Sequence, residues 1–207
     1  MGNYVNYCSK ILKLQRDISK MGVKADLFVD GNERNFKLAE CIKNTLKKIF
    51  DLKIKIPKFK ISLNNWEDMS KNTAAETETE LLGKKNDITV NFNTPLYKNT
   101  DKDGNWYRTK KYPDSTTICA DFLHEFAHAY QSYFNPKAYD RLLTQGFGHD
   151  EKVIPEISKN IGNYATFSKA EFVAEYFRVK MSGNKFKSEV LDKIYKDCEG
   201  PEIPSQS

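Results

Sequence analysis

Apolar side chains in the first fifty residues recur at spacings of three and four, which is the period of one face of an α-helix. This pattern predicts a helix over about residues 4–21, which ends at Gly22, and a second helix over about 33–50. The dipeptide Asp30-Gly31 predicts the turn between them. The chain therefore begins with two amphipathic helices of the kind that build a scaffold.

From residue 53 onward the period changes to two, which indicates β-strands. Apolar residues alternate with lysine up to residue 63, and Pro57 interrupts the alternation, which suggests an edge strand or a bulge. Residues 76–93 predict a hairpin whose turn lies at 83–86. The polar segment 94–112 predicts a loop. Together these segments predict a short mixed sheet.

Helical periodicity returns in the second half of the chain. One helix fits between Pro113 and Pro136, with Ser115 or Thr116 as its cap. Further helices are predicted near residues 137–143, near 155–161, and after a cap at Ser168. The overall prediction is an α+β fold.

The helix before Pro136 carries an HExxH motif, in which His124 and His128 are separated by one helical turn. Side chains at this spacing lie on the same face, so both imidazoles can reach one ion while Glu125 flanks it. This is the geometry of a zinc site in which the glutamate acts as a general base and is not itself a ligand. The chain has only 3 histidines, and two of them are in this motif.

Length, charge and cysteine content limit the number of domains, the kinds of metal ligand and the classes of binding partner. A chain of 207 residues suits one domain, and no apolar stretch reaches the length of a membrane span. The four cysteines show no CxxC pair, so we expect buried free thiols, and we do not expect Cys119 to be a ligand. The net charge of +5 is concentrated in lysines of the first 63 residues, spaced as on a solvated face, so nucleic-acid binding is not indicated.

A catalytic zinc ion takes three protein ligands and keeps a fourth position for water. Glu171 is one candidate for the third ligand, because a cap at Ser168 begins a helix on which Glu171 and Glu175 share a face. His149, which follows Gly148, is the other candidate.

Three further residues are expected to hold the imidazole ligands in place. Asp121 and Gln131 lie one turn before His124 and one turn after His128, and Glu175 faces Glu171. Metal-bound histidines usually donate their second N–H to such groups, and we favour Glu175 in this role.

The segments HEFAHAY and AEFVAEYF, with Glu171 placed 43 residues after His128, resemble the metallopeptidase domain of anthrax lethal factor and its relatives, including secreted clostridial Pro-Pro endopeptidases. The resemblance covers roughly residues 87–181 and is specific at both motifs. It implies that Glu171 is the third zinc ligand. It also implies that Tyr164, seven residues earlier, assists at the oxyanion. The linker GFGHDEKV has no clear counterpart in that family, and the N-terminal third is not covered.

The resulting prediction is a zincin-like zinc metalloendopeptidase that binds one Zn²⁺ per chain. We expect an N-terminal helical part over residues 1–52 packed on a catalytic domain over 53–199, followed by a disordered tail over 200–207. A peptide substrate is expected to extend along an edge strand at 87–93 and to contact Val90, Asn91, Phe92 and Asn93.

Two alternatives remain open. A SprT-like protease would use His149 as the third ligand, and a non-catalytic zinc-binding interaction protein would use its Lys-rich helices as the working surface. The N-terminus lacks the features of a signal peptide, which predicts a cytoplasmic protein or one delivered by another route. We expect a monomer, and the composition hints at a bacterial or phage source.

Overall fold

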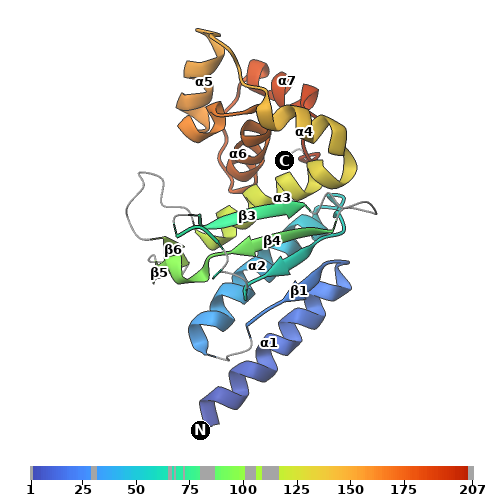
Figure 1. Ribbon diagram of the computed structural model, residues 1–207, viewed down its shortest axis with the longest axis vertical. Coiled ribbons are helices and arrows are strands. Elements are labelled where there is room, and N and C mark those ends of the chain that lie inside the picture. Colours follow the sequence, from blue (N-terminus) through green and yellow to red (C-terminus); the bar gives the residue numbers. More distant parts are fainter. Residues whose placement is uncertain are drawn as a thin grey trace. The chain divides into compact units, whose positions relative to one another are not determined.

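The computed structural model combines helices with small sheets, in agreement with the predicted α+β class (Figure 1). It describes residues 2–28, 32–64, 67, 69–71, 73–79, 87–100, 106–108 and 117–204. The chain forms two compact units, residues 1–122 and 123–207, and the division falls within helix α3 (Ile118–Phe134). In the described part of the chain, no helix is long and apolar enough to cross a membrane.

The first unit opens with the two predicted helices, α1 (Gly2–Lys20) and α2 (Glu33–Asp51), which pack against each other. Asn32 caps α2, because its side-chain oxygen accepts a hydrogen bond of 2.8 Å from the backbone N–H of Asn35. The apolar face of α2 is fully buried, as its period predicts; it consists of Leu38, Ala39, Ile42, Leu46 and Ile49.

Within the described residues, four strands form a mixed sheet in the order β1-β2-β4-β3. Strands β1, β2 and β4 are parallel, and β3 is antiparallel to β4. Their bounds are Lys24–Asp26, Lys60–Ser62, Ala75–Thr79 and Ile88–Phe92 in chain order. The predicted hairpin corresponds to β3 and β4, and its turn lies outside the described residues.

This sheet differs from the predictions in two respects. The alternating segment after residue 53 forms only the short strand β2. The strand β1 was not predicted, and it pairs with β2 across the expected boundary between residues 52 and 53. The N-terminal helices therefore belong to the same unit as the sheet, and the two units meet instead between residues 122 and 123.

Strand β4 is an inner strand, paired with β2 on one side and with β3 on the other. The prediction that residues 87–93 form an edge strand for a peptide is wrong, because the neighbouring strands already use the backbone hydrogen bonds of β4. The side chains expected to contact substrate, Val90, Asn91, Phe92 and Asn93, are all buried.

The segment predicted as a polar loop contains a 3₁₀ turn, η2 (Thr94–Leu96), and a second, two-stranded sheet of β5 (Tyr97–Thr100) and β6 (Trp106–Arg108). Tyr97 is fully buried, and its hydroxyl donates a hydrogen bond of 2.6 Å to Asp121. One buried side chain thus fixes a segment whose composition is polar.

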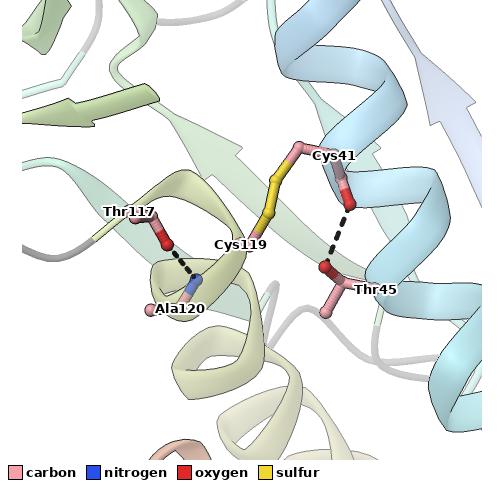
Figure 2. Close-up of a disulfide and its surroundings, with 5 residues drawn as sticks. All are labelled: Cys41, Thr45, Thr117, Cys119 and Ala120. Carbon is pink, nitrogen blue, oxygen red and sulfur yellow. Dashed lines mark hydrogen bonds between the residues drawn. A yellow bond between two sulfur atoms is a disulfide. The ribbon is translucent and has the colours of Figure 1, made fainter. Parts of the chain in front are cut away.

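A disulfide joins Cys41 of α2 to Cys119 in the first turn of α3 (Figure 2). Their Cα atoms are 5.8 Å apart, within the usual range for a disulfide. The expectation of free thiols is therefore wrong for these two residues, whereas Cys8 and Cys198 are free.

The second unit is helical. After the C-terminal part of α3 come α4 (Pro136–Thr144), α5 (Val153–Asn160), the 3₁₀ turn η3 (Asn163–Thr166), α6 (Lys169–Met181) and α7 (Glu189–Asp197). All except η3 and α7 were predicted. The hydroxyl of Tyr195, in α7, donates a hydrogen bond of 2.7 Å to the carbonyl of Pro201, so the start of the expected disordered tail is held against the unit.

Candidate metal centre

The HExxH motif lies in the middle of α3. The helix is capped by Thr117, whose hydroxyl accepts a hydrogen bond of 3.2 Å from the N–H of Ala120 (Figure 2). The caps suggested by the sequence, Ser115 and Thr116, lie outside the described residues. One turn apart, the rings of His124 and His128 have centroids 4.7 Å apart, and both side chains are buried.

Helix α6 brings the third group to the two imidazoles. Ser168 caps this helix as predicted, accepting a hydrogen bond of 3.1 Å from the N–H of Glu171. The cap fixes Glu171 in the first turn, where its Oε2 lies 3.2 Å from Nε2 of His124 and 3.5 Å from Nε2 of His128. One ligand atom from each of these three residues lies within 4.8 Å of the others.

The donor set fits a metal ion. The two Nε2 atoms are only 3.0 Å apart, and Oε2 of Glu171 is buried without a hydrogen-bond partner in the described structure. Electron-pair donors that converge in this way repel one another unless a cation or a proton lies between them. Two imidazoles and one carboxylate are the ligands of many catalytic zinc sites.

Glu175 holds His124 from the side opposite Nε2. Its Oε1 lies 2.8 Å from Nδ1 of His124. This is the contact predicted for Glu175 as the residue that accepts the second N–H of a metal-bound histidine. A neutral His124 that donates from Nδ1 keeps its lone pair on Nε2, the atom that faces Glu171.

Arg178 extends this chain of contacts by one residue. It lies one turn after Glu175, and its Nε donates a hydrogen bond of 3.0 Å to the other carboxylate oxygen of Glu175. A second contact runs from Nη2 of Arg178 to the same oxygen. Arg178 therefore fixes the carboxylate that orients His124, a role that sequence spacing alone did not suggest.

The imidazole of His124 lowers the pKa of both carboxylates that touch it. Burial disfavours a charged Glu171, but the adjacent imidazoles of His124 and His128 outweigh burial and lower the pKa of Glu171 well below its ordinary value. Burial acts in the same direction on Glu175, where His124 and Arg178 outweigh it and lower the pKa.

The charge of these carboxylates acts in turn on the imidazole between them. Burial alone would lower the pKa of His124, but its contacts with Glu171 and Glu175 raise the pKa well above the ordinary value. Without a metal, the site therefore favours a proton on His124. A metal ion must displace that proton, as is usual for histidine ligands.

Two tyrosines border the site. The ring centroid of Tyr164, in η3, lies 5.9 Å from that of His124, although Tyr164 is 52% exposed. The ring of Tyr139, in α4, is buried and lies 5.8 Å from the ring of His128. Sequence reasoning missed Tyr139, because a single apolar position in a short helix carries no sign of a metal site.

Burial first, and then the negative charges of Glu125 and Glu171, raise the pKa of Tyr139. The same carboxylate of Glu125 raises the pKa of His124. Glu125 is itself buried, and it does not belong to the group of three ligand atoms. Its negative charge thus acts on both His124 and Tyr139.

Three predicted residues lie elsewhere. His149 is exposed and is not part of the ligand group found among the described residues. The amide nitrogen of Gln131 donates a hydrogen bond of 2.8 Å to the carbonyl of Cys198, while its oxygen and Nδ1 of His128 are both buried without a hydrogen bond to any described residue, so Gln131 does not hold His128. The carboxylate of Asp121 accepts a hydrogen bond from Tyr97, and Nδ1 of His124 contacts Glu175.

Comparisons with models of known protein families, with curated proteins and with solved structures found no match to this chain.

Proposed function

We propose that the chain is a zinc metalloendopeptidase with a zincin-like catalytic fold, similar to the lethal factor family. One observation carries the proposal: two Nε2 atoms and a carboxylate oxygen converge, while a second carboxylate, Glu125, acts on His124 without joining the group. A purely structural zinc site does not need that extra carboxylate, whereas a hydrolytic site needs a base.

His124, His128 and Glu171 would hold the ion. A zinc ion bound by such ligands polarises a peptide carbonyl and lowers the pKa of an adjacent water. Glu125 takes a proton from the attacking water and passes it to the nitrogen of the leaving amine as the C–N bond breaks. Tyr164 donates a hydrogen bond to the carbonyl oxygen as negative charge develops there. Glu175, fixed by Arg178, keeps His124 in the tautomer that offers Nε2.

Zinc-dependent cleavage of a random peptide library tests this function. We expect the zinc-loaded protein to cleave a subset of peptides, a chelator to abolish cleavage, and added zinc to restore it. Cleavage that survives complete removal of metal would contradict the proposal. Stoichiometric zinc with no cleavage of any peptide would instead favour a non-catalytic zinc-binding protein.

The choice of third ligand is tested by metal analysis of two variants. Loss of a residue that only orients a ligand weakens metal binding by roughly ten- to a hundredfold. Glu171→Ala should weaken zinc binding by more than that, because it removes a direct ligand. His149→Ala should bind zinc like the wild type, because His149 lies outside the ligand group. The reverse result would replace this proposal with a SprT-like site.

Replacing Tyr164 with Phe is expected to lower kcat by roughly ten- to a thousandfold, because one hydrogen-bond donor to the developing oxyanion is lost. Zinc affinity and KM should change little, since the hydroxyl is not a ligand and its interaction strengthens only in the transition state. Steady-state kinetics on the best library peptide, together with zinc titration, measure these quantities.

Tyr139→Phe is the matched comparison for Tyr164→Phe. It also removes a phenol hydroxyl from a ring near a histidine ligand, and we expect it to change kcat by less than about threefold. A larger loss in Tyr139→Phe than in Tyr164→Phe would transfer the oxyanion role to Tyr139.

A further inference from the structure

The most exposed large apolar side chain in the described part of the chain is Phe167, at 74%. Scattered exposed apolar residues are normal on protein surfaces and need no explanation. Phe167 differs from them because its neighbour is a second exposed aromatic residue: its ring centroid lies 5.4 Å from that of Tyr164. Adjacent exposed apolar groups are typical of binding sites.

These two rings form a row that begins at the metal centre. Tyr164 contacts His124 on one side and Phe167 on the other, with ring-centroid distances of 5.9 Å and 5.4 Å. The backbone of η3 produces this alignment, because residues three apart in a 3₁₀ turn point in the same direction. The N–H of Phe167 donates a hydrogen bond of 3.2 Å to the carbonyl of Tyr164 and closes the turn.

The exposure of Phe167 does not come from a loose segment. Ala165, two residues before it, is fully buried, and Ser168, directly after it, is buried as the cap of α6. The N–H of Lys169 donates a hydrogen bond of 2.8 Å to the carbonyl of Gln145. The backbone is thus held on both sides of Phe167, whose ring is exposed beside that of Tyr164.

We propose that Phe167 is a specificity-determining residue, which binds an apolar side chain of the peptide substrate close to the scissile bond. The inference rests on the proposed peptidase function and adds the substrate class: peptides with an aromatic or large aliphatic residue at one position beside the cleaved bond. Such a side chain would cover the exposed ring, and both groups would lose apolar contact with water. Carboxylate side chains at that position gain nothing from the phenyl ring, because its face carries partial negative charge.

The cleavage profile of the zinc-loaded protein on a random peptide library provides the first test. Wild type should prefer apolar residues at one position next to the cut, and Phe167→Ser should lose at least about fivefold of that preference while preferences elsewhere stay the same. Phe167→Leu should retain most of it. Leu143→Ser is the matched control, since Leu143 is also an exposed large apolar residue of the second unit, and it should leave the profile unchanged.

Binding without turnover provides the second test. In zinc-loaded Glu125→Gln protein, fluorescence anisotropy would measure the affinity of the best-cleaved library peptide and of the same peptide with its apolar residue changed to Ser. Adding Phe167→Ser should weaken binding of the first peptide by about fivefold and leave the second unchanged. Equal effects on both peptides, or no effect on either, would overturn the inference.

The outcomes separate this inference from the function on which it rests. Zinc-dependent cleavage with the same profile in wild type and Phe167→Ser overturns the role of Phe167 and leaves the peptidase proposal intact. A zinc-loaded wild-type protein that cleaves no peptide overturns both.

Discussion

Glu125→Gln is expected to lower the rate of peptide cleavage at least about a hundredfold, because the substituted amide cannot take a proton from the attacking water. The change is nearly isosteric, and Glu125 is not one of the three converging ligand atoms. Zinc content and thermal unfolding should therefore stay close to those of wild type. Single-turnover cleavage of a library peptide measures the rate of the chemical step directly.

The control for Glu125→Gln is Asp140→Asn, which removes the charge of another carboxylate of the second unit. Asp140 is exposed on α4 and lies outside the ligand group, so cleavage should remain within about twofold of wild type. Undiminished turnover in Glu125→Gln protein with full zinc content would rule out Glu125 as the base. A loss of zinc in that variant would mean that Glu125 supports the metal directly.

The parts of the site that sequence could predict depend on local rules. The four-residue spacing of His124 and His128 fixes their common face in any helix. Ser168, three residues before Glu171, predicts a helix cap, and the cap places Glu171 in the first turn of α6. The same four-residue rule places Glu175 with Glu171, and the structure brings both carboxylates to His124.

The parts that sequence could not predict depend on contacts between distant segments. Tyr139 reaches His128 only because α4 folds back after Asn135, and Gln131 turns to a carbonyl that lies 67 residues further along the chain. Strand β4 is an inner strand because β2 pairs with it on the side opposite β3. The alternating pattern up to residue 63 predicts a strand there, but a pattern within one segment does not reveal which other strand it pairs with.

The pairing of Cys41 with Cys119 is another contact between distant segments that the sequence does not predict, since four cysteines without a motif do not reveal their partners. Its presence also bears on where the chain works. Disulfides persist in oxidising surroundings and are rare in reducing cytosol. Formation of the Cys41–Cys119 bond therefore requires that the chain be exposed to oxidising surroundings.

Removing this disulfide with the double variant Cys41→Ala/Cys119→Ala is expected to lower the free energy of unfolding by about 4.5 kcal/mol, the loop-closure value for the chain between them. The two cysteines are separated by 78 positions, so the bond removes many conformations of the unfolded first unit. A loss of that size is a large part of the stability of an ordinary domain. Urea unfolding followed by circular dichroism, with the wild type fully oxidised, measures the difference.

Cys8→Ser is the matched control for the double variant, because Cys8 is a free and partly exposed cysteine of the same unit. It should change the free energy of unfolding by no more than about 0.5 kcal/mol. Thiol titration in denaturant tests the pairing itself. The oxidised wild type should show two reactive thiols, those of Cys8 and Cys198, and full reduction should raise the number to four. Four reactive thiols without a reductant would show that the bond does not form, and the double variant should then unfold at nearly the wild-type urea concentration.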